Sequence, residues 1–224
     1  MDRITRFNNA GIQLLRLGRY DIAHDLLRAS LEAKLAHDRQ EMERQQNPQF
    51  EIRSVSPECV STGEEHLSNL HVYMSQSALP RDEEEGRGER SPHLYIYNEG
   101  FIMQDGTQAS IQLRSAINVF NLGLVHQLKN RREEKTRDFY KVAAILLAMV
   151  PGSPDTLILQ MAVANNFGVW SHDNQDDQQA LSCMRQLAVL VQCCQQHLSR
   201  EVRDGLLSNV TAMGICSRQE NSNK

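Results

Sequence analysis

The feature that most constrains the fold is an apolar run with a central glycine, VFNLGLVH, at residues 119–126. A similar run, ANNFGVWS, occupies residues 164–171, and a more degenerate version, FNNAGIQL, occupies residues 7–14. A glycine within an apolar helix marks a place where another backbone comes close, because glycine carries no side chain. Three copies of one helical unit therefore predict a stack of helical hairpins.

The residues that follow each glycine support a hairpin. A small residue stands 12 or 13 positions after each glycine, and a larger residue stands four positions further on. These pairs are Ala23 and Leu27 after Gly11, Thr136 and Tyr140 after Gly123, and Ala180 and Met184 after Gly168. Small residues at matched places on two helices let the backbones approach, and we expect the larger residues to fill the space beside them.

This pattern resembles the tetratricopeptide repeat, which reads large-x2-Leu-Gly-x2-Tyr in its first helix and Ala-x3-Phe-x2-Ala in its second. The first copy matches best, with Phe7, Ala10, Gly11, Leu14, Gly18, Tyr20, Ala23, Leu27 and Ser30. The resemblance covers about half of the chain, and the glycines are 112 and 45 residues apart instead of the family's 34 or so. It implies an all-α fold of stacked antiparallel helical hairpins, and the strand-like residues 93–103 add one short β-like segment. The alternative is an irregular helical bundle.

We expect five regions along the chain. Residues 1–45 form the first hairpin, and residues 46–93, rich in Ser, Pro and charge, form a disordered or loosely ordered insertion. Residues 94–106 form an extended or hairpin strap, because HLYIYNEGFIM at 93–103 has two short β-favouring runs. Residues 107–216 hold two further hairpins and a capping helix, and residues 217–224 form a tail. The strap either lies along the helices, which we favour, or occupies the binding groove.

Composition excludes several classes of protein. A net charge of -4 and a pI near 6.1 argue against nucleic-acid binding. The longest apolar run, residues 142–150, is far shorter than the roughly 20 residues that a membrane span needs. Five cysteines without disulfide-scaffold spacing suggest a soluble intracellular protein of the cytoplasm or nucleus. No catalytic, metal or phosphate-binding motif is present, so we expect neither an enzyme, nor a metal, nor a cofactor.

The resemblance implies that the first helices of the hairpins line a concave groove. The candidate peptide-binding residues there are Asn8, Asn9, Ile12, Phe120, Asn121, Leu124, Asn165, Asn166 and Val169. An amide carries both a donor and an acceptor, so a column of asparagines can hold an extended peptide backbone. Alternatively, the asparagines bond adjacent hairpins to one another. The cations of the family's carboxylate clamp are replaced by Ile12, Ala162 and Asn166, so we expect no binding of chaperone tails.

These features predict a non-catalytic protein–protein interaction module, an adaptor or scaffold that binds a peptide or helix of a partner protein in the groove. The alternative is a structural assembly subunit that self-associates through its helices. The glutamine-rich stretch at residues 178–196 is one candidate surface for that self-association.

Overall fold

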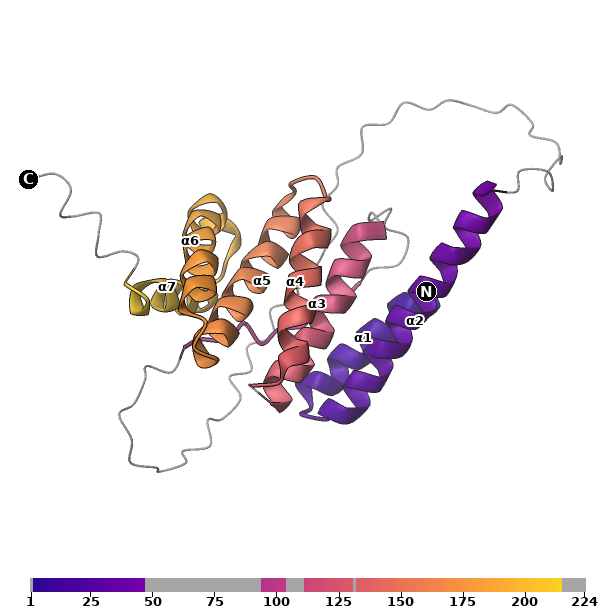
Figure 1. Ribbon diagram of the computed structural model, residues 1–224, viewed down its shortest axis with the longest axis horizontal. Coiled ribbons are helices and arrows are strands. Elements are labelled where there is room, and N and C mark those ends of the chain that lie inside the picture. Colours follow the sequence, from indigo (N-terminus) through magenta and orange to yellow (C-terminus); the bar gives the residue numbers. More distant parts are fainter. Residues whose placement is uncertain (1, 47–93, 104–110, 131, 215–224) are drawn as a thin grey trace, which may run out of the picture.

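The structure is a computed structural model that describes residues 2–46, 94–103, 111–130 and 132–214 (Figure 1). Within these ranges all regular secondary structure is helical. The helices are α1 (Arg3–Arg16), α2 (Tyr20–Gln46), α3 (Ile111–Lys129), α4 (Glu134–Ala148), α5 (Pro154–Asp173), α6 (Asp177–Cys194), the 3-10 helix η2 (Gln195–His197) and α7 (Arg200–Ala212). The expected insertion at 46–93 lies outside the described residues except for Gln46, and so does the tail at 217–224.

The helices pack as consecutive hairpins. The pairs α1–α2, α3–α4 and α5–α6 pack closely, and α2–α3, α4–α5 and α6–α7 join each pair to its successor. Figure 1 shows this order along the stack, with α1 and α2 at one end and α7 at the other. The predicted all-α fold of stacked hairpins is therefore confirmed. No helix in the described ranges is long and apolar enough to cross a membrane.

The three glycines stand where the two helices of each hairpin cross. A Cβ at Gly11 would lie 2.8 Å from Cγ of Leu27, and one at Gly123 would lie 3.0 Å from Cε1 of Tyr140. A Cβ at Gly168 would lie 2.5 Å from the Met184 methyl group. These are the larger residues that the sequence pattern paired with each glycine. The predicted close approach is thus present in all three hairpins.

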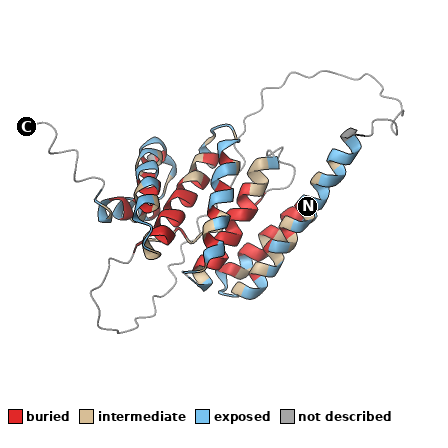
Figure 2. Cartoon of the chain, in the orientation of Figure 1, coloured by how far each residue is buried: buried red, intermediate tan, exposed pale blue. Residues whose placement is uncertain are grey.

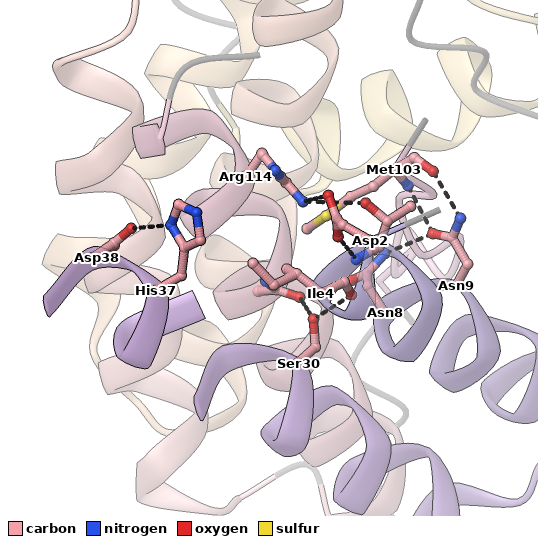
Figure 3. Close-up of polar contacts among 11 residues, drawn as sticks. Asp2, Ile4, Asn8, Asn9, Ser30, His37, Asp38, Met103 and Arg114 are labelled. Carbon is pink, nitrogen blue, oxygen red and sulfur yellow. Dashed lines mark hydrogen bonds and ion pairs between the residues drawn. The ribbon is translucent and has the colours of Figure 1, made fainter. Parts of the chain in front are cut away.

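Polar side chains set the starts of several helices. Asp2 caps α1 by accepting a hydrogen bond from the Thr5 amide at 2.7 Å, and Ser153 caps α5, which begins at Pro154. Asp2 also accepts a hydrogen bond from Nη2 of Arg114 on α3, at 2.6 Å (Figure 3). The first residues of the chain are therefore anchored to the second hairpin.

The hairpin considered for the strap is not formed. Residues 94–103 are extended, and no strand is present among the described residues. Figure 1 shows this segment in magenta, crossing the stack between α7 and the first hairpins. Two short runs need each other's backbone groups to form a hairpin, and here other partners take those groups, as described below. We call residues 94–103 the internal segment.

The inner helices α3 and α5 are buried on nearly all sides. Every residue from Ala116 to Gln127 on α3 is buried, as is every residue from 161 to 171 on α5 (Figure 2). A helix that is buried all round must have packing neighbours on every face. For α3 these are α2, α4, α1 and α5, together with the internal segment.

We predict that Gly11→Val destabilises the protein by about 1–3 kcal/mol, the usual cost of overpacking a close contact. The new side chain would collide with Leu27 and with the Ala23 carbonyl oxygen, which lies 3.3 Å from the Cβ position. Urea unfolding measures the change. Ala36→Val at an exposed site of α2 is the control for the cost of valine in a helix. Equal stability of the two variants would contradict the close approach.

Candidate functional site

The internal segment is held by asparagine side chains that bind its backbone. At its N-terminal end, the Tyr95 amide donates to Oδ1 of Asn209 at 2.7 Å, and Nδ2 of Asn209 donates to the Tyr95 carbonyl oxygen at 2.6 Å. Asn166 makes the same pair of bonds with Tyr97, both at 2.8 Å. Each asparagine thus satisfies the donor and the acceptor of one residue.

The C-terminal half of the segment repeats this arrangement. Asn121 accepts from the Phe101 amide and donates to its carbonyl oxygen, both at 2.9 Å. Asn9 accepts from the Met103 amide at 2.8 Å and donates to its carbonyl oxygen at 2.7 Å (Figure 3). We call the four asparagines at positions 9, 121, 166 and 209 the asparagine track. They lie on α1, α3, α5 and α7, whose common side we call the inner face.

The spacing of the bound residues follows from extended backbone geometry. In an extended chain, residues two positions apart present their backbone groups on the same side. Tyr95 and Tyr97 form one such pair, and Phe101 and Met103 form another. Residues 98–100 bridge the two pairs. The segment begins at α7 and ends at α1, so it runs opposite to the order of the helices.

Two further asparagines support the track. Asn8 donates to the Phe101 carbonyl oxygen at 3.0 Å and accepts from Nδ2 of Asn121 at 2.9 Å. Asn165 donates to the Tyr95 carbonyl oxygen at 3.0 Å and accepts from Nδ2 of Asn209 at 2.7 Å. These amides bond neighbouring hairpins and an extended backbone at once. The asparagines therefore bond adjacent hairpins to one another, as the alternative proposed, and the extended backbone that they hold belongs to this chain.

Aromatic rings of the segment continue into the core. The rings of Tyr97 and Phe101 stack with centroids 5.8 Å apart and an interplanar angle of 19°. Phe101 meets Phe120 of α3 edge to face at 5.3 Å, and Phe120 lies 5.9 Å from Tyr140. Offset and edge-to-face pairs of this kind add to the stabilisation from burial. The segment is thus part of the hydrophobic core.

A buried network orients Asn166. The Tyr140 hydroxyl donates to Oε1 of Gln127 at 2.6 Å. Nε2 of Gln127 donates to the backbone carbonyl oxygen of Asn166 at 3.3 Å. Nδ2 of Asn166 also lies 3.4 Å from the Tyr140 hydroxyl. Burial raises the pKa of Tyr140, so its hydroxyl stays neutral and available as a donor.

The structure brings together most of the residues predicted from the sequence. All five predicted asparagines bond the internal segment, Ile12 packs against Gly100, and Phe120 packs against Phe101. The other two predicted anchors, Leu124 and Val169, are 0% and 1% exposed within the core. They offer no accessible anchor in this state.

Sequence reasoning missed Asn209, because the last helix was expected only to cap the stack. A signal was present: Asn121, Asn165 and Asn209 are each 44 residues apart. The regular spacing indicates that α7 continues the series of inner helices. The segment lies along the helices, as the favoured strap did, and it does so at the candidate residues Asn9, Asn121 and Asn166.

Glu99 is the charged residue of the internal segment. Its Oε2 is buried and has no hydrogen-bond partner among the described residues. Burial raises the pKa of this carboxyl, Arg16 partly opposes the effect, and Glu201 adds to it. The bound segment therefore shifts the protonation equilibrium of Glu99 toward the neutral acid.

Neither a family model, nor a curated protein, nor a solved structure matches this chain. In the described part of the chain, no group of histidine, cysteine, aspartate and glutamate side chains is arranged to hold a metal ion. The geometry of the asparagine track is therefore the main guide to function.

We predict that Asn166→Ala lowers stability by about 1–3 kcal/mol, because it leaves both backbone groups of buried Tyr97 without partners. Hydrogen exchange should show loss of protection at the Tyr97 amide. Asn130→Ala, at an exposed site after α3, is the matched control. Retained protection at Tyr97 would show that the amide contacts do not hold the segment.

We predict that Glu99→Gln strengthens binding of the internal segment at pH 7 and has no effect near pH 4. Because the pKa of Glu99 is raised in the bound segment, its protonated form stabilises binding of the segment. This stabilisation is complete below the ordinary carboxyl pKa and is lost as the pH rises through the raised pKa. Hydrogen exchange of residues 95–103 from pH 4 to 8 measures the effect. Glu43→Gln, on the exposed part of α2, is the control. Equal pH dependence in Glu99→Gln and the parent protein would contradict this account.

Proposed function

We propose that the protein is a non-catalytic adaptor whose tetratricopeptide-like stack binds an extended peptide of a partner protein on the inner face. The supporting observation is that the asparagine track holds backbone groups, at Tyr95, Tyr97, Phe101 and Met103. Every peptide carries such groups, so the track is suited to any extended chain with compatible side chains. The internal segment then acts as a built-in ligand that a partner replaces.

The chemistry of the track favours an extended peptide over a helix. Asn166 and Asn121 each need one free N–H and one free C=O of the ligand. The interior of a helix has already used these groups in its own hydrogen bonds. A helical ligand would leave the asparagine amides unsatisfied, at about 1–3 kcal/mol for each buried group.

The internal segment sets the affinity that a partner must reach. Because it belongs to the same chain, it competes at an effective concentration on the order of millimolar. The apparent affinity of a partner falls in proportion to the fraction of molecules whose inner face is open. Binding is therefore expected to be selective, since only a peptide with several good contacts displaces the segment.

The decisive test weakens the internal segment and supplies its sequence separately. We predict that full-length protein carrying Phe101→Ala binds a labelled LYIYNEGFIM peptide at least tenfold more tightly than the parent protein does. Loss of a buried phenylalanine ring costs about 3–5 kcal/mol, which favours release of the segment. Fluorescence polarisation measures the binding, and circular dichroism confirms the fold.

The matched control adds Asn166→Ala to Phe101→Ala, which should remove the gained binding because it removes a track contact from the inner face. A folded Phe101→Ala protein that binds no peptide at about millimolar concentration would refute the proposed function, since the open face would then have no affinity for its own segment.

A second candidate function is that of an assembly subunit that self-associates through its helices. The observation that favours it is an apolar stripe on α4 and its C-terminal cap, where Val142, Ile145 and Met149 are 45%, 63% and 57% exposed. Their spacing places them on one side of the helix. Sedimentation that shows a monomer at tens of micromolar would remove this alternative.

A further inference from the structure

We infer, on the basis of the proposed function, that the partner carries an extended segment of about ten residues with the chemistry of residues 94–103. In the numbering of this chain, that chemistry is a glycine at position 100 and aromatic rings at positions 95, 97 and 101. Large apolar residues stand at both ends, at positions 94 and 103. The partner segment runs from α7 to α1.

The glycine is required where the segment passes α1. A Cβ at Gly100 would lie 2.2 Å from Cδ1 of Ile12, 3.1 Å from its Cγ1 and 3.2 Å from its Cγ2. Ile12 is fully buried in a close-packed core, so its side chain would have to repack to admit a Cβ here. Glycine is therefore the favoured residue between the two asparagine pairs at this point. Ile12 is thus a specificity residue of the inner face.

A flat ring is favoured at the second position of the segment. A Cβ at Gly205 of α7 would lie 2.7 Å from both Cγ and Cδ2 of the Tyr95 ring and 3.0 Å from its Cδ1. The absence of a side chain at Gly205 lets this ring lie directly on the helix backbone. Gly100 belongs to the ligand and makes room for Ile12 of α1, whereas Gly205 belongs to α7 and makes room for the ligand's Tyr95 ring.

The central pair of rings spans the bridge between the two asparagine pairs. Tyr97 and Phe101 are each 3% exposed and stack on one another, and Phe120 closes the edge of the second ring. The two rings stand four positions apart in the segment. A peptide with only one of the rings loses this contact.

Charge also limits the ligand. Oε2 of Glu99 is buried without a hydrogen-bond partner among the described residues. Burial disfavours the ionised form of this carboxyl, Arg16 partly opposes the effect, and Glu201 adds to it. A carboxylate at this position is therefore disfavoured, and a glutamine in place of Glu99 should bind better. The partner segment is aromatic and largely uncharged.

The test uses full-length Phe101→Ala protein and synthetic ten-residue peptides read by fluorescence polarisation. Replacing the peptide's Gly100 by alanine should weaken binding at least tenfold. Adding Ile12→Ala to the protein should bring the two peptides within about threefold of each other. Gly205→Ala in the protein should weaken the LYIYNEGFIM peptide about tenfold, but not a peptide with alanine in place of Tyr95. A scrambled peptide of the same composition is the control.

The outcomes separate the two proposals. If no peptide binds the folded protein, the proposed function fails. If all peptides, including the scrambled one, bind equally, the proposed function survives and the inference is overturned. If Phe101→Ala does not fold, the contact between Gly100 and Ile12 is tested by substitutions within the otherwise unchanged full-length chain. Gly100→Ala should then abolish protection of the segment from hydrogen exchange, and the double variant with Ile12→Ala should restore it. Absence of that restoration overturns the inference.

Discussion

The structure depends on the match between a primary amide and the peptide backbone. A buried extended chain must satisfy the N–H and C=O of every inward-facing residue, and neighbouring strands usually do this. Here single asparagine side chains do it, because each carries an acceptor oxygen and a donor nitrogen on the same carbon. Asn166 serves both groups of Tyr97, and Asn121 serves both groups of Phe101. A stack of helices thereby holds an extended segment without any strand of its own.

This arrangement couples stability to binding. Phe101 packs on Phe120, which in turn packs on Tyr140, so a ring of the segment is continuous with the core of the second hairpin. Tyr140 also fixes Asn166 through Gln127. The segment covers part of the inner helices α3 and α5. A partner that replaces the segment must therefore restore the same apolar contacts, which explains why the proposed ligand resembles it.

The two candidate functions use different surfaces of the same stack. The inner face is polar where it meets the ligand backbone and apolar beside it, a combination suited to peptides. The exposed stripe on α4, which includes Ile145, carries no such pairing and would serve only contact between folded surfaces. The asparagine track is the more specific feature of the two, because its hydrogen bonds require donors and acceptors at fixed positions of the ligand. For this reason peptide binding is the leading proposal.

The sequence by itself determined the helical hairpins and the nature of their contacts. Gly11 and its partner Leu27 lie close together in the chain, so their pairing follows from local periodicity. It also marked the asparagines as a column able to hold an extended backbone. Only the tertiary structure decided which backbone that is. Asn8 meets Phe101 across 93 residues and Asn209 meets Tyr95 across 114, and local patterns carry no information about contacts at such separations.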